Sequence, residues 1–463
     1  LSRLRGGEGI RTENPQVSAS VAIQASRIAE FLASGEDLPR LGSGCTTTVP
    51  HRAFLCQDKR WLAVGVIRDA QWVGLCKAIG AADLLEDPRF VTNPGRVKNR
   101  EEIEERLEAI FRDKPARWWV LQLRKRKVPV SLFYDYESIP DLEQVRANRF
   151  IVPIKYSRVG TLPFGNIPFQ LSKTPVSLRP GPWPGQDTEK VIEEGWGENG
   201  ASPAKGYFGP TGPVAKGVLD GVTVVDLTQG LAGPYASLLL ADAGAKVIKV
   251  EPPEGDYTRG WGQPVTDEVG AVFYHLNRNK EGERLDLRKK GHRERLRELL
   301  NGADILIEEE GQVRMRRLGL AYQELAKENP GLIYCTITPH GERGPLRNQP
   351  ASELTLQAMS DFPNMLGVPG EEPVRMGPDM ASLGTSLYAT HGILGALYHK
   401  WRTGEGQHVT VSMLGSILFQ RGINWLGTKN PDDWNGFIDY MKPPDQGYQA
   451  KDRRIILGPI QNQ

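Results

Sequence analysis

The sequence of 463 residues has few cysteines and few histidines. Its four cysteines contain no C-x-x-C pair and are too sparse for a disulfide framework in so long a chain. Its seven histidines form no H-E-x-x-H motif, and their spacing offers no cluster of metal ligands. We therefore expect a reducing, cytoplasmic environment and no metal site.

The sequence also lacks a long hydrophobic run and an excess of charge of either sign. No uninterrupted apolar stretch approaches the ~20 residues of a membrane-spanning helix, and 58 Lys and Arg against 56 Asp and Glu leave a net charge of +2. We expect no membrane span, and neither nucleic acid nor an anionic membrane as the main partner. The chain begins with Leu1 and its first residues show no signal-like stretch, so we expect a piece of a longer chain.

A β-α-β pattern is the clearest structural signal in the sequence. Residues 222–227 (VTVVDL) are typical of a strand, a glycine turn follows, residues 234–242 are typical of a helix, and residues 246–250 (KVIKV) are typical of a second strand. The further strand-like segments ADILIEE and GLIYCTIT alternate with helical stretches. This alternation predicts an α/β fold with an open, parallel, Rossmann-like sheet. A long helix is predicted over residues 383–399, from its apolar stripe.

Two pairs of segments are related by one offset of 394 residues. VSASVAIQ at Val17 matches VSMLGSIL at Val411, and FLCQDKRWLAVG at Phe54 matches YQAKDRRIILGP at Tyr448. The shared offset predicts that a module of roughly 400 residues occurs twice in a parent protein, with this chain holding the end of one copy and the front of the next. Chance similarity between amphipathic segments is the alternative.

Longer motifs carry a resemblance to a known family. In the second half these motifs are GVTVVDLTQGLAGPYASLLLADAGAKVIKVEPPEGDYTR, LNRNKEGERLDL, ADILIEEEGQVRMRRLGL and PVRMGPDMASLGTSLYATHGILGALYHKWRTGEGQHVTVSML. They resemble the family III CoA-transferases, also called the CaiB/BaiF family, which include formyl-CoA transferase, carnitine CoA-transferase and α-methylacyl-CoA racemase. In the first half, LEDPRFVTNPGRVKNREEIEERLEAIF, KVPVSLFYDYESIPDLEQVRANRFI and LSKTPV resemble that family's smaller domain, which normally follows the larger one. The reversed order is expected in the middle of a tandem fusion.

The resemblance and the repeat together imply a large open-sheet domain and a smaller α+β domain. Residues 1–50 are predicted to end a preceding large domain and to supply a connecting helix. Residues 51–176 are predicted to form the small domain of the first copy, and residues 177–220, rich in Pro and Gly, a linker. Residues 221–440 are predicted to form the large CoA-binding domain of the second copy, and residues 441–463 the start of its small domain.

A coenzyme A site is implied by the resemblance at the turn that precedes the helix. Coenzyme A carries phosphates, so its site needs a close backbone approach, a helix N-terminus and cations. The implied contacts lie in the turn and on three further segments, at Gly230, Leu231, Ala232, Arg259, Leu276, Lys280 and Arg317. A tight turn without a ligand, and ordinary surface charge, are the alternatives. The chain departs from the family at Pro253, where a basic residue is common, and at Glu309 and Glu310, whose charges would repel a nucleotide.

The family's chemistry rests on one carboxylate, which forms a mixed anhydride and then an aspartyl-CoA thioester. Ungapped alignment on PVRMG and GILGAL places Ser382 at that position, and the nearest carboxylate is Asp379. Asp379 is the predicted catalytic residue, with an N-cap of the long helix as the alternative. Glu353 resembles an acidic residue that lies close to the family's active site. It is a candidate orienting residue, and a solvated residue at the start of a helix is the alternative. His340 lies in a loop that the resemblance places near the thioester. The alternative is that His340 is an ordinary surface residue.

The predicted function is transfer of CoA between an acyl-CoA and a carboxylic acid, without a metal. An interlocked dimer, or an intramolecular pseudo-dimer with the rest of the parent chain, is the implied assembly. A non-catalytic CoA-binding or scaffolding half is a second hypothesis, because Ser382 cannot form the carboxylic anhydride. A dinucleotide-dependent oxidoreductase is a third, suggested by Glu251 at the end of the second strand, although QGLAGP lacks G-x-G-x-x-G. Racemase or lyase chemistry of the same family is a further alternative.

Overall fold

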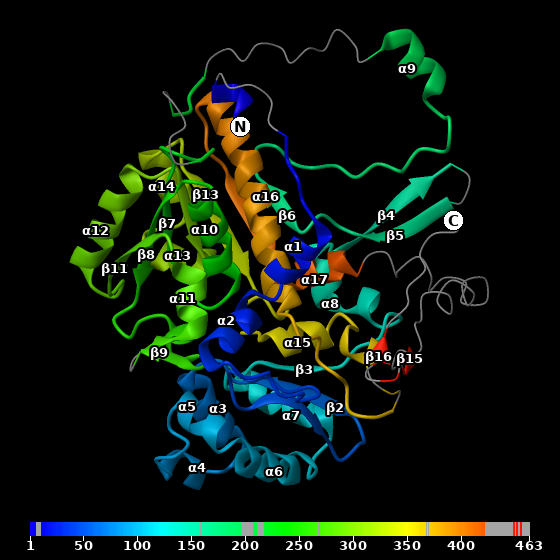
Figure 1. Cartoon of the computed structure of the whole chain (residues 1–463), viewed down its shortest axis with the longest axis vertical. Coiled ribbons are helices and arrows are strands. Elements are labelled where there is room, and N and C mark those ends of the chain that lie inside the picture. The colour runs from blue at the N-terminus through cyan, green and yellow to red at the C-terminus, as the bar shows by residue number, and fades with distance from the viewer. Residues whose placement is uncertain are drawn as a thin grey trace.

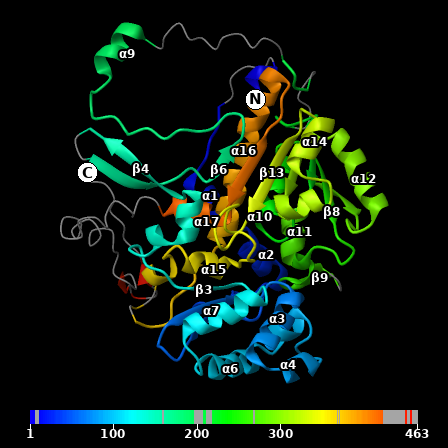
Figure 2. The same ribbon diagram turned by 180° about the vertical axis from the view of Figure 1, so that it is seen from behind.

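The fold was analysed in a computed structural model of the chain. The structure describes residues 1–5, 11–157, 160–195, 207–210, 217–266, 269–366, 368, 370–421, 448–449, 451 and 454–455. We call residues 11–195 the N-terminal region and residues 217–421 the C-terminal region. Figures 1 and 2 show them from opposite sides, with the N-terminal region's helices α3 to α7 gathered at one end of the molecule.

The N-terminal region is a mixed α+β assembly. Its helices are α1 (Gln16–Ala22), α2 (Ala25–Ser34), α3 (Asp69–Ile79), α4 (Asp83–Glu86), α5 (Asn93–Lys98), α6 (Arg100–Phe111), α7 (Ala116–Lys125), α8 (Glu143–Asn148) and α9 (Thr188–Glu194). Its strands are β1 (His51–Leu55), β2 (Trp61–Gly65), β3 (Val130–Leu132), β4 (Ile151–Tyr156), β5 (Gly160–Gly165) and β6 (Phe169–Leu171). A short 3-10 turn occupies Ile139–Asp141, and another, Arg3–Arg5, precedes the N-terminal region.

Strands β1, β2 and β3 form a small antiparallel sheet that is covered on both faces. Helices α3, α6 and α7 bury the first face, where Phe54, Trp72 and Phe111 are almost inaccessible to solvent. The other face receives a helix of the C-terminal region, through Ala63 of β2 and Leu354. A short sheet of this kind needs both layers, since either face alone would leave apolar side chains in water.

The C-terminal region supplies most of the large sheet. Its strands are β7 (Thr223–Asp226), β8 (Lys246–Glu251), β9 (Pro264–Thr266), β10 (Val269–Gly270), β11 (Lys280–Arg284), β12 (Ile305–Glu308), β13 (Ile333–Thr338) and β14 (His408–Ser412). Its helices are α10 (Ala232–Asp242), α11 (Ala271–Asn277), α12 (Lys290–Asn301), α13 (Gln312–Arg317), α14 (Tyr322–Glu328), α15 (Glu353–Ala358), α16 (Met380–Thr403) and α17 (Met413–Gln420), with 3-10 turns at Tyr257–Gly260 and Pro363–Met365.

Seven strands form the large sheet in the order β11-β8-β7-β12-β13-β14-β6. Six of them are parallel, and β6 runs antiparallel to β14 at one edge. Side chains of β12 alternate between the two faces: Ile305 and Ile307 pack with α10 and α16, whereas Leu306 packs with α12 to α14. A parallel strand covered by helices on both faces is apolar throughout. The predicted open α/β sheet is confirmed, and α10 begins at Ala232, two residues before the predicted start.

The order of the strands creates a switch point between β7 and β12. From β7 the chain winds outward to β8 and β11, and it then returns to lay β12 on the opposite side of β7. The connections that leave the carboxyl ends of β7 and β12 therefore diverge. In open α/β sheets, ligands bind in the crevice that such divergence leaves.

Elements of the N-terminal region lie directly against the C-terminal region. Helix α2 packs against α11, and α15 lies on β2 and β3 (Figure 1). Strand β6 comes from the predicted small domain, yet its Phe169–Leu171 segment pairs with β14 of the large sheet. The two regions thus share one sheet and one interface, and the predicted domain boundaries stay a prediction.

The short pair β15 (Tyr448–Gln449) and β16 (Arg454–Ile455) lies where the 394-residue offset carries β1 and β2. Leu55 pairs with Trp61 in the first hairpin, and Gln449 pairs with Arg454 here, one residue short of the register that the offset implies. Most of residues 441–463 lies outside the described part of the chain, so the repeat stays a prediction.

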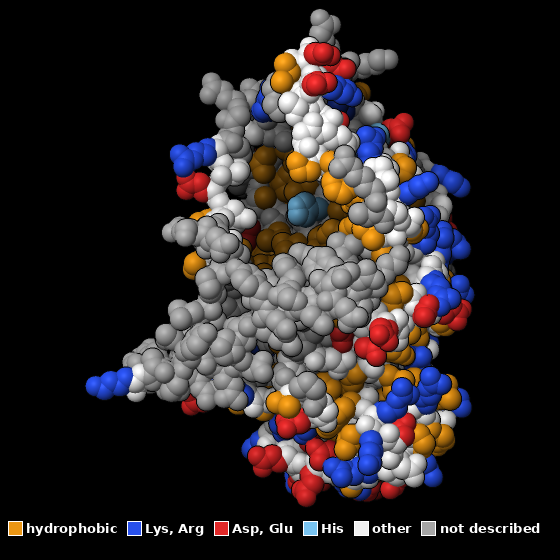
Figure 3. All heavy atoms as spheres, turned by 90° about the vertical axis from the view of Figure 1, so that its right-hand side faces the viewer, with side chains coloured by type: hydrophobic (Ala, Val, Ile, Leu, Met, Phe, Trp, Pro, Cys, Tyr) orange, Lys and Arg blue, Asp and Glu red, His pale blue; other side chains and the backbone are white. Residues whose placement is uncertain are grey.

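The surface on one side of the molecule has two parts of different character (Figure 3). The upper part is hollowed, with mainly hydrophobic side chains on its walls, and the lower part carries basic and acidic side chains in mixed order. Among the described residues, no helix combines the length and the apolar character needed to cross a membrane.

Candidate active site

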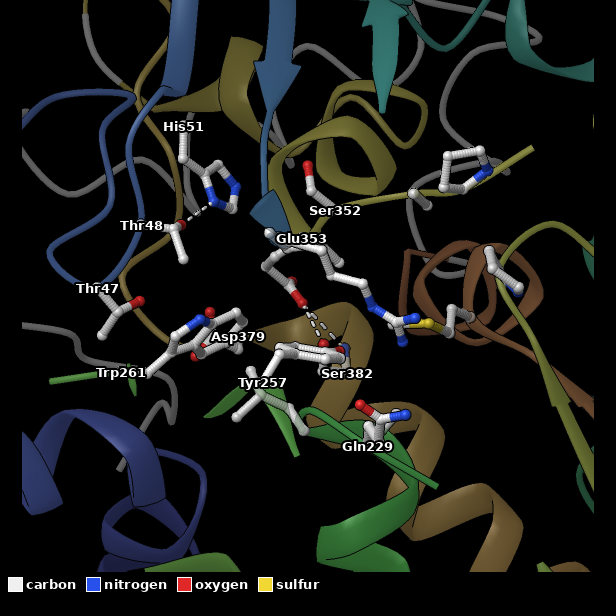
Figure 4. A pocket seen from close by; sticks show the side chains of 18 of the residues that line it. Thr47, Thr48, His51, Gln229, Tyr257, Trp261, Ser352, Glu353, Asp379 and Ser382 are labelled. Atoms are coloured by element: carbon white, nitrogen blue, oxygen red, sulfur yellow. Dashed lines mark hydrogen bonds between the residues drawn. The ribbon is translucent and has the colours of Figure 1, made fainter. Parts of the chain in front are cut away.

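A cavity of about 260 Å³ lies at the carboxyl ends of the large sheet, beside the switch point. Residues that follow β7, β12, β13 and β14 form one wall, and the N-terminal region closes the other. The N-terminal region contributes Ser26, Arg27, Cys45, Thr47, Thr48, His51, Ile67, Arg68 and Gln71. The C-terminal region contributes, among others, Gln229, Leu231, Ala232, Tyr257, Trp261, Glu309, Glu353, Asp379 and Ser382, several of them labelled in Figure 4.

Asp379 lines this cavity and is held by three side chains. The Ser26 hydroxyl donates to Oδ2 at 2.7 Å, Arg27 Nη2 donates to Oδ1 at 3.1 Å, and Arg375 Nη2 donates to Oδ1. Burial raises the pKa of the Asp379 carboxyl, but the charges of the two arginines lower it more strongly, so the net shift is downward. Asp379 is therefore a buried, ionised carboxylate in the wall of the cavity.

Glu353, not Asp379, caps the long helix α16. Asp379 occupies the N-cap position, but its side chain accepts no hydrogen bond from the first turn. Glu353 instead accepts hydrogen bonds from the amides of Ala381 at 2.7 Å and Ser382 at 3.0 Å. These amides have no partner within the helix, and the positive end of the helix dipole favours a carboxylate. The alternative that Asp379 serves as a capping side chain is wrong.

Ser382 is bound to the same carboxylate. Its hydroxyl donates to Oε2 of Glu353 at 2.8 Å, as Figure 4 shows. Burial and the neighbouring charge of Asp379 raise the pKa of Glu353. Glu353 thus holds the hydroxyl of Ser382, and its orienting role in a reaction stays a prediction. The solvated alternative is excluded, because only 7% of Glu353 is exposed.

Cys45 and His51 form a further corner of the cavity. Arg27 Nη2 donates to the Cys45 sulfur at 3.7 Å, and the hydroxyl of Thr47 lies 3.2 Å from the same sulfur. His51 Nδ1 lies 2.9 Å from the hydroxyl of Thr48 (Figure 4). Burial raises the pKa of the Cys45 thiol, but Arg27 and His51 lower it more, and the net pKa is well below its usual value.

The turn between β7 and α10 is built as the sequence predicts. Gly230 has a φ of 79°, and a Cβ there would lie 2.0 Å from the hydroxyl of Tyr257, so glycine is required. Leu231 and Ala232 follow it into the cavity wall. The amide of Gln229, which would face an anionic ligand, already donates to Glu309 Oε1 at 3.0 Å. A protein carboxylate thus occupies one of the donors that the turn offers.

Lys280 and Leu276 lie beneath this turn. The Lys280 ammonium donates to the Pro234 carbonyl at 2.9 Å and lies 3.3 Å from Asp226 Oδ2, in a buried network. Burial lowers the pKa of Lys280 to about 8. Leu276 is fully buried, packed with Tyr235 and Trp261. Neither residue lines the cavity.

The remaining predicted residues lie further away. Arg259 forms a bidentate ion pair with Glu251, at 2.7 and 2.8 Å, and Arg317 is exposed at the end of α13. His340 is 4% exposed, and its Nδ1 lies 3.2 Å from the carbonyl of Gln349, so the surface alternative is wrong. Burial lowers the pKa of His340 to about 4, which leaves the ring neutral. The coenzyme A contacts implied for these residues stay predictions.

Sequence reasoning missed the part of the site that the N-terminal region supplies. Arg27 lies 352 residues from Asp379 in the chain, and Arg68 lies 241 residues from Glu309. No local pattern marks either arginine, because Arg27 lies within α2 and Arg68 directly precedes α3, both ordinary positions for an arginine. Only the packing of α2 and α3 against the large domain brings them to the cavity.

The described residues contain no group of three or more His, Cys, Asp or Glu side chains placed to hold a metal ion. The cavity lining offers several hydroxyls, a thiol, a histidine and four carboxylates, of which Asp379 and Glu353 are buried. The carboxylates differ in a useful way, because arginines hold Asp379 ionised whereas Glu353 has a raised pKa. Pairs of carboxyls with opposite shifts are typical of sites that move protons or form covalent intermediates.

Three comparisons show which known proteins the chain resembles. A family model described as CoA-transferase family III matches residues 1–188 and 219–463. An acetyl-CoA:oxalate CoA-transferase of Acetobacter aceti is 39% identical over 248 residues, covering 52% of this chain and 63% of that protein. A succinyl-CoA:glutarate CoA-transferase of Mus musculus is 34% identical over 250 residues, covering 53% and 57%.

Among solved structures, a CAIB/BAIF family protein from Brucella suis is 34% identical and covers 48% of this chain and 58% of that one, with a TM-score of 0.43. The chain spans 57% to 63% of the length of the two curated relatives named above.

Proposed function

The chain belongs to CoA-transferase family III, and on this premise we propose that it moves coenzyme A from an acyl-CoA to a carboxylic acid. One observation carries the proposal: the matched chain folds so that a cavity with a buried, ionised carboxylate in its wall stands at the switch point of its sheet. A thioester entering such a cavity meets a nucleophile that is shielded from water.

Asp379 is the proposed nucleophile. Its carboxylate oxygen attacks the acyl carbon, the carbon–sulfur bond breaks, and coenzyme A leaves as a thiolate from a mixed anhydride. The thiolate then attacks the Asp379 carbonyl carbon, and the donor acid leaves as a carboxylate that carries away one aspartyl oxygen. The acceptor acid repeats the two steps in reverse order and departs as the new acyl-CoA. Each step conserves charge, and none needs a metal.

Arg27, Arg375 and Ser26 support the proposed steps by their contacts with Asp379. Positive groups at this carboxylate keep it ionised, and they favour the negative charge that develops on its oxygen when the thiolate attacks. The same contacts also reduce the nucleophilicity of the oxygen, so part of the arginine pairing must loosen when the thioester binds.

The named relatives act on oxalate and glutarate. We therefore extend the proposal to a short dicarboxylic acid as the acceptor. A cavity of about 260 Å³ has room for a small acyl group rather than a long chain. Two apolar rings, Tyr257 and Trp261, form part of its wall.

A second candidate function is that of a non-catalytic CoA-binding half of a larger protein. It is favoured by Ser382, whose hydroxyl stands where family members are implied to have the nucleophile and is fixed on Glu353. A transferase whose other half supplies the chemistry would keep this cavity as a binding site alone.

The test compares Asp379→Ala with Ser382→Ala. The protein is incubated with acetyl-CoA or succinyl-CoA and oxalate or glutarate, and the new thioester is measured. We expect at least a ~10³-fold loss of exchange in Asp379→Ala and a smaller loss in Ser382→Ala, because the hydroxyl only lines the cavity.

Isotope tracing checks the covalent step separately. Oxygen-18 in the carboxylate of the acceptor acid should appear in the Asp379 peptide during turnover, because the acceptor leaves one of its oxygens on the aspartate. Full exchange by Asp379→Ala would exclude this nucleophile and leave the activity to another group. Absence of exchange in the unmodified protein, with CoA still bound, would favour the non-catalytic half.

A further inference from the structure

Arg68 stands where the cavity opens into an adjoining groove of about 860 Å³. It lines both spaces, whereas Asp379 lines the cavity alone. Arg68 directly precedes α3 of the N-terminal region, and Asp379 directly precedes α16 of the C-terminal region. Two segments that are far apart in the chain thus bring a carboxylate to the inside of the cavity and a guanidinium to its open end.

The described lining of the cavity contains three basic residues, Arg27, His51 and Arg68. Arg27 is held between two buried carboxylates, at 2.6 and 3.1 Å. His51 is engaged at both ring nitrogens, because Nδ1 lies 2.9 Å from the hydroxyl of Thr48 and Nε2 accepts a backbone amide at 3.3 Å. Arg68 is therefore the basic side chain of this lining that is open to an incoming anion.

The pairing of Arg68 with a protein carboxylate is weak. Within the described part of the chain its ion-pair partner is Glu309, with Nη2 3.5 Å from Oε1. The same oxygen accepts the amide of Gln229 at 3.0 Å. Burial raises the pKa of Glu309 to about 8, so this carboxyl mostly keeps its proton near neutral pH and leaves the charge of Arg68 uncompensated.

The surroundings of Arg68 hold its guanidinium in place without using up its N–H groups. The guanidinium lies over the ring of Tyr257, 4.6 Å from the ring centre, where it keeps N–H groups for a carboxylate. Gln71 fixes the backbone here, since its side-chain oxygen accepts the amides of Ile67 at 2.9 Å and Arg68 at 3.2 Å. A ligand would therefore meet a cation whose backbone is already ordered.

A dicarboxylic acid needs such a cation in this cavity. The described lining already contains four carboxyls, at Glu309, Glu310, Glu353 and Asp379. In the proposed reaction one carboxylate of the acceptor reacts at Asp379, so the other brings a further negative charge into a partly desolvated space. That charge is costly unless a cation meets it. A monocarboxylic acid of the same length brings no second charge and gains nothing from the guanidinium.

We propose that Arg68 selects dicarboxylic acceptors, because its guanidinium binds the second carboxylate of the acid while the first reacts at Asp379. The inference rests on the proposed function and names a residue that determines specificity within it. Hydrogen bonds between arginine and a carboxylate are charge-assisted, and two of them form in parallel when the geometry allows. A site built to pair a polar group of its substrate discriminates against the analogue that lacks this group.

The experiment compares glutarate with pentanoate, which has the same number of carbons and a single carboxylate. Acetyl-CoA is the donor, so only the acceptor brings a second carboxylate. The variants are Arg68→Met, which removes the charge, and Arg68→Lys, which keeps the charge without the planar fork of donors. The matched control is Arg117→Met, because Arg117 is exposed on α7 and lines neither the cavity nor the groove.

The readout is the ratio of kcat/KM for glutarate to kcat/KM for pentanoate. We expect Arg68→Met to lower this ratio by about tenfold or more, chiefly through a higher KM for glutarate. Arg68→Lys should recover part of the ratio, and Arg117→Met should match the unmodified protein. An unchanged ratio in Arg68→Met, with CoA still transferred to glutarate, would overturn the inference and leave the proposed function standing.

Three further results are decisive. Equal losses for both acids in Arg68→Met would overturn the inference, because Arg68 would then act on a feature that the two acids share. Equal use of both acids by the unmodified protein would overturn it as well. If the unmodified protein transfers CoA to neither acid, the proposed function fails and the inference with it. Thermal unfolding of each variant checks folding, and Arg68→Lys carries the test if Arg68→Met does not fold.

Discussion

The cavity and the adjoining groove of about 860 Å³, whose lining includes Arg316 and Arg347, hold their charges in opposite ways. In the cavity, Asp379 is met by Arg27 and Arg375, and Arg27 also reaches Glu30 at 2.6 Å. In the groove, cations such as Arg316 and Arg347 stand in solvent without a carboxylate partner among the described residues. The two spaces adjoin, so the contrast reflects burial rather than location.

This difference in pairing indicates what each set of charges is able to do. A buried charge must be paired and hydrogen-bonded, since an uncompensated charge in a poorly solvated interior costs several kcal/mol. An exposed charge is already solvated, and it exchanges water for a ligand at little cost. The cavity's ions are therefore suited to hold a precise geometry, and the groove's ions to attract and release a ligand.

Removing one arginine from each space gives the largest expected contrast. Arg27→Met leaves the buried Glu30 without its cation and Asp379 with Arg375 alone, and we expect a loss of about 3–5 kcal/mol in the free energy of unfolding. Arg347→Met in the groove should change it by less than about 0.5 kcal/mol. Urea titration of both variants measures the difference. Similar losses would mean that the groove's charges are structural as well.

A glycine substitution tests how strongly the backbone of the turn between β7 and α10 is constrained. Gly230→Ala meets both a positive φ and the Tyr257 hydroxyl, and we expect a loss of about 1–3 kcal/mol. Gly282→Ala on β11 is the control, since a Cβ there meets nothing within 4 Å. Thermal unfolding measures both. A neutral Gly230→Ala would show that the turn is free to rearrange.

The pH dependence of stability separates two carboxylates of the cavity. Asp379 has a lowered pKa, so its contribution is present above the unfolded-state pKa of about 3.9 and is lost as the pH falls through its folded pKa. Burial raises the pKa of Glu309 from 4.5 to about 8, so the folded protein keeps a proton there that the unfolded chain releases. The unmodified protein should therefore lose stability relative to Glu309→Gln as the pH rises between these values.

The measurement is denaturant unfolding at a series of pH values. The unmodified protein should have a larger free energy of unfolding than Asp379→Asn near neutral pH. This difference should shrink only as the pH becomes acidic. The two variants must show opposite slopes against pH. Slopes of the same sign would contradict the assigned environments.

The smallest expected effect concerns cysteine reactivity. Cys45, on the cavity wall beside Arg27, should react with iodoacetamide at neutral pH. Burial raises the pKa of Cys56 and Cys76 to about 12 and also raises that of Cys335, so these three should stay unmodified in the folded protein. Peptide mass spectrometry reports all four thiols in one sample, with Cys45→Ser as the blank. Uniform labelling would contradict the special environment of Cys45.

Local sequence patterns predicted the large sheet well. The apolar run of residues 222–227, the glycine turn and the helix that follows it reappear as β7 and α10, because strand and helix periodicity are local properties. The same reasoning could not place β6, whose three residues join the sheet only through pairing with β14. Pairing between distant segments leaves no periodic signal in either of them.

The candidate site was predictable in part for the same reason. Asp379, Glu353 and Ser382 lie within one stretch of chain, and motif spacing pointed to all three. Their roles depend on contacts. Glu353 accepts the helix-capping hydrogen bonds that the sequence suggested for Asp379, and Arg27, from the opposite end of the chain, pairs with Asp379. A spacing rule identifies candidate groups, whereas a pKa or a hydrogen bond depends on what packs against them.

The sequence by itself determined the order of strands and helices, the glycine turn and the family of this chain, since these depend on neighbours along the chain. Tertiary structure alone decided which carboxylate is ionised, which amide is already occupied and which cations remain open to a ligand. Electrostatic interactions act through space and strengthen where water is excluded. The ionisation and pairing of these side chains therefore depend on the packing of the N-terminal region against the carboxyl ends of the sheet.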